Sequence, residues 1–467
     1  MCLWRRRKLR CFLFLLIASI LSLIFQIWFI HNNSQFQGGS SFQGMVTKWL
    51  NSGSNDAQEN LKLFMKHASQ ANLPLFLMDP SVLEAVRNVS RGSVDERRAP
   101  HHCRYLCSSQ GVITLGLLGD SDVKVKPDLL QRLHGEGFQY VITEGHDPRL
   151  ASVASMAAGK VPHHMLFRRH NFLIHIVVLY ERPGKFLWHA AIEPEKTQKW
   201  MSLVEDRELP FGEYEGAYDK MEIVPTKLDG VKLNIPKIPS AFLQQIPHAR
   251  FLECNYGQAR KFHTAYGSDQ TAEGVEFVGK AKSLLSQGRA VLDRIGVRFW
   301  MSSGTCLGWF RQCGIIPHSK DVDFGIWIKD YKDTLIPAFQ AAGLSLKHRF
   351  GKVEDSFELS FQSGDVKLDI FFFYEEDDIM WNGGTQARTG KKFKYIFPRF
   401  TLCWTEFLDM KVRVPCETLA YVQANYGANW YEPVKQWDWK NSPPNVVPNG
   451  QWPEEEWSEV IQLFDVR

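Results

Sequence analysis

The fold of the C-terminal half of this chain is decided by residues 315–326, which read Ile315-Ile316-Pro317-His318-Ser319-Lys320-Asp321-Val322-Asp323-Phe324-Gly325-Ile326. Val322, Phe324 and Ile326 alternate with other residues, as in a β-strand with one buried face. Asp321 and Asp323 are two residues apart, so both must project from the same face of that strand. Neighbouring carboxylates repel each other unless a cation lies between them. Hard oxygen ligands at this spacing suit Mg²⁺ or Mn²⁺ shared with substrate phosphates.

The residues before this strand predict a helix, a strand and a small-residue turn. Apolar residues recur at helical spacing through residues 271–295, and Gly296 can end that helix in the left-handed conformation. A strand is expected over residues 297–302 and a short helix over residues 306–311. Between them lie Ser303, Gly304 and Thr305, a turn whose backbone N–H groups can approach a phosphate at the helix start.

A third carboxylate is expected beside the first two. Residues 357–362 and 366–373 alternate as the strands of a hairpin, which places Asp369 in the middle of the second strand. An isolated Asp-x-Asp is as easily explained as a solvated strand end. The whole combination is more specific and indicates an α/β (α+β) fold with a nucleotidyltransferase-like catalytic palm, in which three acids hold metal against a phosphate chain.

Seven short segments carry a family resemblance. They are Gly304-Thr305-Cys306-Leu307-Gly308-Trp309-Phe310-Arg311, Ile316-Pro317 with Asp321-Val322-Asp323, Leu368-Asp369-Ile370-Phe371, Ala424-Asn425-Tyr426-Gly427, Lys352-Val353-Glu354-Asp355-Ser356, Trp381-Asn382-Gly383-Gly384-Thr385-Gln386 and Trp437-Asp438-Trp439-Lys440. The first four resemble the LicD-type phosphotransferases, which move an alcohol phosphate from a CDP-linked donor to a sugar hydroxyl. The last three resemble the fukutin branch of that family. This resemblance implies a Golgi enzyme that transfers ribitol 5-phosphate from CDP-ribitol to the O-mannosyl glycan of α-dystroglycan.

The resemblance also implies roles for individual side chains. Asp321 and Asp323 would hold the metal on the donor diphosphate, and Asp369 would complete the site or take the acceptor proton. Arg311 would steady the phosphates. Bacterial relatives usually carry further acids just before the Asp-x-Asp, where this chain has His, Ser and Lys. The metal count therefore stays open, and Lys320 is a candidate to supply the positive charge of a second ion.

A basic segment is expected to be a Gly-containing loop and the best local patch for anions. The alternative is a solvated basic loop with no ligand. The residues of this segment are Arg388, Lys391, Lys392, Lys394 and Arg399.

The composition is that of an ordinary globular protein. The chain has 467 residues, 44% of them hydrophobic, so it is too long for one compact core and two folded domains are expected. With 55 basic and 51 acidic residues the net charge is only +4, which gives no overall positive field. We therefore expect no nucleic-acid partner.

The N-terminal residues predict a membrane anchor and a tether. A basic cluster within residues 1–10 precedes an uncharged apolar run over residues 11–30, which is long enough for one transmembrane helix. The basic tail is expected to stay cytosolic, which makes the chain a single-pass type II protein of the Golgi membrane, with a long signal peptide as the alternative. Residues 31–58 are rich in Asn, Ser, Gln and Gly and are expected to be a flexible stem.

Two lumenal domains are expected after the stem. Residues 59–258 mix short apolar runs with Gly and Pro breaks, which predicts a separate N-terminal α/β domain. Its clearest element is a hairpin over residues 172–192. Residues 270–467 are expected to form the LicD-like catalytic domain.

Lumenal placement predicts disulfides, because that compartment is oxidising. Seven of the nine cysteines follow the anchor, so at least one must stay unpaired. Cys103 and Cys107 are expected to form a disulfide, with a zinc site as the less favoured alternative. Cys306 and Cys313 present the same choice. Asn88 begins a glycosylation sequon.

Two other functions fit parts of the sequence. The large N-terminal half carries no recognisable catalytic motif, which is consistent with a non-catalytic lumenal scaffold for partner glycosyltransferases. A nucleotidyltransferase that makes a CDP-alcohol would have a similar palm. The expected lumenal position of the catalytic domain disfavours that activity, because activated donors are usually made outside the Golgi lumen.

Overall fold

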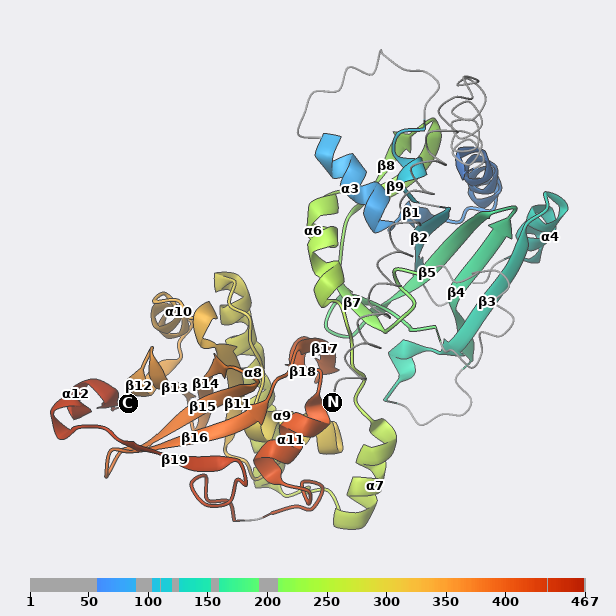
Figure 1. Cartoon of the computed structure of the whole chain (residues 1–467). Helices are drawn as coiled ribbons and strands as arrows, with labels where there is room; N and C mark the ends of the chain where they lie inside the picture. The colour runs from blue at the N-terminus through green and yellow to red at the C-terminus, as the bar shows by residue number, and fades with distance from the viewer. Residues whose placement is uncertain are drawn as a thin grey trace, which may run out of the picture. The chain divides into compact units, whose positions relative to one another are not determined.

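The structure is a computed structural model (Figure 1) that describes residues 57–89, 103–109, 111–119, 126–152, 159–192, 209–434 and 436–465. The expected cytosolic tail and anchor lie outside these residues, as does the expected stem up to residue 56. Of the helices that the structure describes, none has both the length and the apolar character that a bilayer crossing requires. The anchor therefore stays a prediction.

The described residues of the N-terminal half are built on a mixed sheet of nine strands. They are β1 (Leu75–Leu77), β2 (Val112–Gly119), β3 (Gln139–His146), β4 (Lys160–Arg169), β5 (Phe172–Arg182), β6 (Phe186–His189), β7 (Gly216–Asp219), β8 (Ile223–Leu228) and β9 (Val231–Pro236). Seven of them follow the order β3-β4-β5-β2-β1-β9-β8, and β6 joins β5 to β7. The antiparallel pairing of β5 with β6 confirms the predicted hairpin. The parallel strands β2 and β5 are buried over most of their length and form the centre of this half.

Figure 1 labels three helices around this sheet: α3 (Pro80–Val89), α4 (Pro127–Gly135) and α6 (Pro239–Gln245). Each has proline as its first residue, where the missing N–H costs no helical hydrogen bond. Residues 57–70 form a further helix. Asn88 lies at the end of α3, and Ser90 of its sequon lies outside the described residues, so glycosylation stays a prediction.

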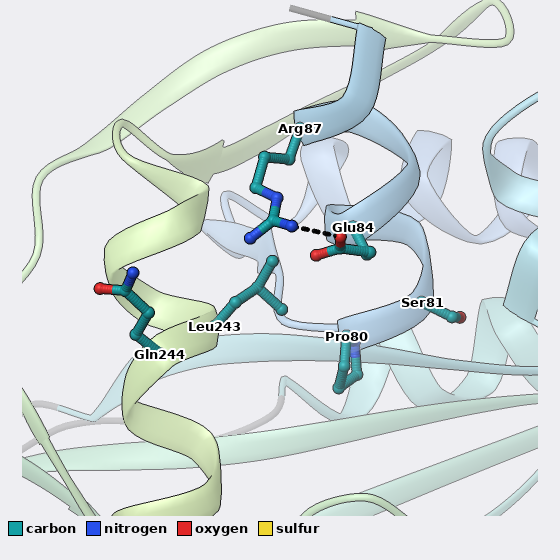
Figure 2. A pocket seen from close by; sticks show the side chains of 6 residues that line it. All are labelled: Pro80, Ser81, Glu84, Arg87, Leu243 and Gln244. Carbon is teal, nitrogen blue, oxygen red and sulfur yellow. Dashed lines mark hydrogen bonds and ion pairs between the residues drawn. The ribbon is translucent and has the colours of Figure 1, made fainter. Parts of the chain in front are cut away.

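Helices α3 and α6 lie side by side and line a surface pocket of about 430 Å³ (Figure 2). Its two charged lining residues, Arg87 and Glu84, form an ion pair of 2.6 Å within α3. The two charges cancel, so these residues give the pocket no net charge. The lining residues are Pro80, Ser81, Glu84, Arg87, Leu243 and Gln244.

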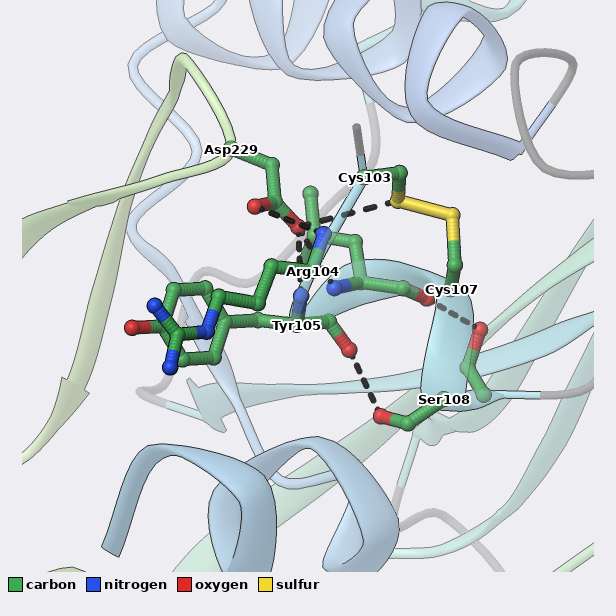
Figure 3. Close-up of a disulfide and its surroundings, with 8 residues drawn as sticks. Cys103, Arg104, Tyr105, Cys107, Ser108 and Asp229 are labelled. Carbon is green, nitrogen blue, oxygen red and sulfur yellow. Dashed lines mark hydrogen bonds between the residues drawn. A yellow bond between two sulfur atoms is a disulfide. The ribbon is translucent and has the colours of Figure 1, made fainter. Parts of the chain in front are cut away.

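The Cys103–Cys107 disulfide closes a tight turn ahead of β2 (Figure 3). Asp229, in the turn between β8 and β9, accepts hydrogen bonds from the backbone N–H groups of residues 104, 105 and 106 at 3.0, 2.8 and 2.8 Å. The carboxylate thereby joins the turn that contains the disulfide to the β8–β9 turn, which is distant in sequence. The predicted disulfide is confirmed over the zinc alternative.

Two helices precede the C-terminal sheet, α7 (Tyr256–Tyr266) and α8 (Ala272–Ile295). The side chain of Thr271 caps the start of α8, and Gly296 ends it with φ at 65°, which confirms the predicted helix and its glycine stop. Gly288 allows α8 to pack directly on the sheet. A Cβ at this position would lie 2.8 Å from Leu368 Cδ2 and 2.9 Å from the Phe324 ring.

In the described part of the C-terminal half there is a second sheet of nine strands and one separate hairpin. The sheet strands are β10 (Trp300–Met301), β11 (Asp321–Trp327), β12 (Ser345–Lys352), β13 (Asp355–Ser363), β14 (Val366–Glu376), β15 (Ile379–Gln386), β16 (Lys391–Pro398), β19 (Val446–Gln451) and β20 (Ile461–Leu463). Seven follow the order β19-β16-β15-β14-β13-β12-β20. Strand β11 pairs with β10 and, in parallel, with β14. The hairpin consists of β17 (Leu402–Phe407) and β18 (Met410–Pro415), and the remaining helices are α9 (Ser303–Gln312), α10 (Leu335–Ala341), α11 (Thr418–Tyr426) and α12 (Trp457–Val460).

Three local predictions in this half need correction, two in their bounds and one in its type of structure. The strand expected over residues 297–302 is confined to β10, and the helix expected from residue 306 already begins at Ser303. The small-residue turn is thus the first turn of α9. The expected basic loop is largely strand β16, because residues 391–398 pair over their whole length with β15.

The cysteine pairing follows the tertiary fold. Cys313 is bonded to Cys254, and Cys306 is the free, buried cysteine that the odd count predicts. A bond between Cys306 and Cys313 is excluded because seven residues along a helix span about 10 Å, beyond the reach of a disulfide. Cys403 and Cys416 form a third disulfide.

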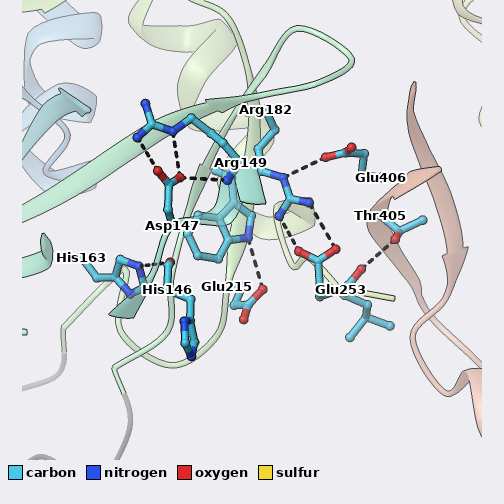
Figure 4. A network of polar contacts seen from close by, with 11 residues as sticks. His146, Asp147, Arg149, His163, Arg182, Glu215, Glu253, Thr405 and Glu406 are labelled. Atoms are coloured by element: carbon cyan, nitrogen blue, oxygen red, sulfur yellow. Dashed lines mark hydrogen bonds and ion pairs between the residues drawn. The ribbon is translucent and has the colours of Figure 1, made fainter. Parts of the chain in front are cut away.

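A buried arginine joins the strands of the two halves (Figure 4). Arg182, at the end of β5, donates to Glu406 of β17 at 2.8 Å and is also paired with Glu253. Burial alone would lower the pKa of Arg182, but these two carboxylates outweigh it and raise that pKa. Beside this network Glu215 accepts a hydrogen bond from the Trp188 indole at 3.2 Å.

Candidate active site

The three predicted acids come together near the beginnings of strands β11 and β14. These strands run parallel with Asp323 opposite Asp369, and Asp321 opposite Lys367. One carboxylate oxygen from each of the three acids lies within 4.8 Å of the others. Phe324 and Leu368 project from the other face of the sheet, where they pack against α8. The alternation of the two strands thus separates an apolar core face from an acidic face.

The acids are held in an environment that disfavours their negative charge. Asp323 and Asp369 are only 5% and 6% exposed. Burial raises the pKa of Asp323 well above its usual range, and the neighbouring carboxylates of Asp321 and Asp369 raise it further. Burial and then Asp369 also raise the pKa of Asp321. Three carboxylates this close together, two of them buried, form a donor set that a hard divalent cation would stabilise.

The first turn of α9 holds Asp323 in place. The backbone N–H of Thr305 donates to Asp323 Oδ2 at 3.2 Å, and the backbone N–H of Asp323 donates to Thr305 Oγ1 at 2.8 Å. A Cβ on Gly304 would lie 3.4 Å from both Asp323 Oδ2 and Ser319 Oγ, so this glycine lies directly beside the acids. The structure therefore places Gly304 and Thr305, in the first turn of α9, beside Asp323. Phosphate binding by this turn stays a prediction.

Two residues of the site were missed by sequence reasoning. Lys367 Nζ lies 3.0 Å from Asp369 Oδ2, and the Ser360 hydroxyl donates to Asp369 Oδ1. Burial lowers the pKa of Lys367, but Asp369 and then Asp321 outweigh this effect and raise it overall. Lys367 could have been found, because it stands two residues before Asp369 on one strand. Ser360 could not, because its place opposite Asp369 depends on the register of β13 and β14.

Tyrosines of α11 border the site. The Tyr421 hydroxyl is 2.7 Å from the Ser302 hydroxyl, next to the start of α9. Burial and then the nearby Asp323 raise the pKa of Tyr426 well above its usual range. Its ring lies 5.0 Å from the ring of the exposed Trp437. An aromatic wall thus runs from the acids toward the surface.

Arg311 is placed differently from the acids. It is 4% exposed, bonds to the Gln312 side chain at 2.8 Å and lies 4.6 Å over the Phe262 ring. Burial lowers its pKa to about 10, although nearby tyrosines, Tyr426 first, act in the opposite direction. A contact between Arg311 and the acids is not among the interactions of the described residues. Its predicted role on the phosphates stays a prediction.

The predicted basic residues are also dispersed. Lys392 pairs with Asp355 and Lys394 with Glu376, each at 2.6 Å, so two of the three β16 lysines are already neutralised. Lys391 is exposed at the start of the strand. Lys320 is exposed in the turn before β11, with φ at 75°. Anion binding by these four lysines stays a prediction.

Comparisons with known proteins agree with this architecture. Residues 4–282 match the family model for the fukutin N-terminal region, and residues 296–417 match the model for the LicD/FKTN/FKRP nucleotidyltransferase domain. The second match contains Asp321, Asp323 and Asp369 and confirms the predicted type of catalytic domain.

Curated relatives cover almost the whole chain. It is 47% identical over 459 residues to the Homo sapiens protein named ribitol-5-phosphate transferase FKTN, which covers 96% of this chain and 97% of that protein. It is 50% identical over 412 residues to the Mus musculus protein of the same name, which covers 86% and 88% of the two chains. Ribitol 5-phosphate transferase FKRP of Homo sapiens is 31% identical over 96 residues, 19% of each chain. With a fukutin-type N-terminal region, a LicD-type nucleotidyltransferase domain and relatives this similar over nearly its full length, the chain belongs to the fukutin family.

Proposed function

We propose that this chain is a metal-dependent phosphotransferase that moves ribitol 5-phosphate from CDP-ribitol to a sugar hydroxyl. The observation that carries the proposal is the convergence of Asp321, Asp323 and Asp369 on one face of a LicD-type domain. The curated relatives that share this domain and the rest of the chain are named ribitol-5-phosphate transferases.

The reaction is a displacement at phosphorus. The acceptor hydroxyl oxygen bonds to the phosphorus that carries ribitol, the bond from that phosphorus to the CMP oxygen breaks, and the hydroxyl proton passes to a base or to water. Negative charge moves onto phosphate and leaving-group oxygens, so the site must supply positive charge and alignment. A bound Mg²⁺ or Mn²⁺ would supply that charge, and the three carboxylates offer the hard oxygens that either ion prefers.

The contacts divide the work among the acids. Asp321 and Asp323 project side by side and would hold the ion on the donor diphosphate. Thr305 orients Asp323, and the Ser319 hydroxyl orients Asp321 through a hydrogen bond of 2.9 Å. Asp369 accepts a hydrogen bond from the Ser360 hydroxyl with one oxygen and pairs with the Lys367 ammonium through the other. Both oxygens are thereby engaged, so we assign Asp369 to charge balance rather than to proton transfer.

The setting we propose is the lumenal side of the Golgi membrane, with an uncleaved anchor over residues 11–30. Three disulfides among the described residues support an oxidising compartment. The proposed acceptor is the O-mannosyl glycan of α-dystroglycan, and other glycosyltransferases of that pathway are proposed partners.

The test is transfer by the full-length chain purified in mild detergent. The chain is incubated with CDP-ribitol, Mg²⁺ or Mn²⁺ and a panel of O-mannosyl glycopeptides. CMP release and a gain of one ribitol phosphate on the glycopeptide are followed together. CDP-glycerol in place of CDP-ribitol, and Asp323→Asn in place of the wild type, are the matched controls. A wild-type chain that binds the glycopeptide but releases no CMP under any of these conditions would favour the scaffold function.

A further inference from the structure

The acidic site contains one positive charge that belongs to the protein. Strands β11 and β14 each present two side chains at the site, two residues apart, and the register places them in a square: Asp321 opposite Lys367 and Asp323 opposite Asp369. Three corners are carboxylates and the fourth is a lysine. The lysine Nζ lies 3.0 Å from Asp369 Oδ2, with its side chain 33% exposed.

The position of this ammonium decides what else can bind Asp369. One oxygen of Asp369 accepts from the Ser360 hydroxyl and the other lies against Lys367. A divalent ion that bridged Asp369 to the other acids would lie next to the lysine ammonium and be repelled by it. Asp321 and Asp323 are different, because their hydrogen bonds come from neutral donors, Ser319 and Thr305. The only ammonium in contact with the acid cluster, among the described residues, is therefore on the Asp369 side.

Lys320 does not fill this place. It is exposed in the turn before β11. Lys367, in contrast, is fixed by two strands and a carboxylate. A lysine on a rigid strand pair is a point charge whose location is set before any ligand arrives.

We propose that Lys367 is the second cation of this active site, so that the site holds one divalent ion, between Asp321 and Asp323, instead of two. The inference rests on the proposed function, since it concerns the same metal-dependent transfer. A second divalent ion would meet the lysine charge at the Asp369 corner and be repelled. Removing that charge while keeping the length of the side chain should open the corner to a second ion.

The test counts bound metal without any turnover. Mn²⁺ is titrated into the full-length chain in mild detergent, and free Mn²⁺ is measured by electron paramagnetic resonance. We expect one Mn²⁺ per wild-type chain, one for Lys367→Arg and two for Lys367→Met. Lys320→Met is the matched control and should still bind one. Thermal melting of each variant in EDTA establishes that it is folded.

The outcomes separate this inference from the proposed function. Two Mn²⁺ in the wild type, or one in a folded Lys367→Met chain, would overturn the role of Lys367. If Lys367→Met does not fold, the counts for the wild type and for Lys367→Arg still decide, because two ions in either would contradict the proposal. Absence of Mn²⁺ binding by the wild type would overturn the inference together with the metal-dependent part of the proposed function. A count of one with no transfer of ribitol phosphate would leave the inference standing and refute the activity.

Discussion

Asp323 on β11 and Asp369 on β14, which are distant in sequence, are direct partners across two parallel strands. Both carboxylates are buried, and Asp369 contributes to the raised pKa of Asp323. A protein that keeps such a pair must stabilise it with a cation or accept a local loss of stability. This relationship underlies the first two predictions.

Replacing either Asp321 or Asp323 by Asn should abolish most of the activity. Each change removes one charged oxygen ligand and keeps the side-chain volume. We expect kcat/KM to fall by about two orders of magnitude or more. The measurement is CMP release at saturating Mg²⁺ or Mn²⁺. Asp365→Asn, an exposed change in the β13–β14 turn, is the control and should retain wild-type rates. Wild-type turnover in Asp323→Asn would remove that residue from the site.

Divalent cations should stabilise the folded chain through the same acids. At a concentration about 100 times the Kd, bound ligand adds about 2.7 kcal/mol to the free energy of unfolding. For a chain of this size we expect a rise in Tm of about 2–4 °C. Differential scanning fluorimetry with Mn²⁺ and with EDTA measures it. Asp323→Asn should lose most of the shift, whereas Asp365→Asn should keep it. An equal shift in both variants would mean that the stabilising ion binds elsewhere.

Lys391 can be tested separately from the other two lysines of β16. Lys391 is exposed, whereas Lys392 and Lys394 are each paired with an acid. If Lys391 attracts the donor or a phosphorylated acceptor, Lys391→Ala should raise one KM and make it less sensitive to salt, because the lost attraction is Coulombic. Lys282→Ala on α8 is the control. A KM for both substrates that matches the wild type at low and high salt would mean that Lys391 is only a surface residue.

Glu215 should make stability depend on pH near neutrality. Burial and then Glu253 raise its pKa to about 7, from 4.5 in the unfolded chain. The folded state therefore holds the proton more tightly, and the stability that this provides is complete below about pH 4.5 and is lost as the pH rises to about 7. Glu215→Gln cannot ionise, so its Tm at pH 8 should exceed the wild-type value by about 1–3 °C.

The control for Glu215 is the exposed neighbour Glu213, whose change to Gln should have no such effect. The comparison of interest is the difference in Tm between pH 5 and pH 8 for each chain. If wild type and Glu215→Gln lose the same stability over this range, Glu215 does not carry the dependence.

The membrane anchor is tested on the intact protein in cells. If residues 11–30 are an uncleaved anchor, the chain should keep its N-terminus, stay with membranes in alkaline carbonate and expose its C-terminus to protease only after detergent. N-terminal sequencing of the main intracellular form checks this directly. A mature chain that begins near residue 31 would support the signal-peptide alternative.

Features that depend on neighbours along the chain could be predicted from the sequence. The period of two around Asp321 and Asp323 placed both acids on one strand face, and the hairpin pattern placed Asp369 in a strand. Local capping geometry sets the two ends of α8, with Thr271 at its start and Gly296 at its end. The odd cysteine count required a free thiol, which is Cys306. These follow because backbone periodicity, capping and parity need no knowledge of the fold.

Features that depend on partners distant in sequence were decided only by the tertiary structure. The parallel register of β11 with β14 brought Lys367 to the three acids. Lys320 is instead exposed ahead of β11. Pairing with β15 turned an expected basic loop into a strand, and Cys254 rather than Cys306 reached Cys313. The physical reason is that strand register and side-chain pairing are chosen by the burial of whole sheet faces. That choice sums over contacts between distant segments and leaves no mark in the local pattern of either segment.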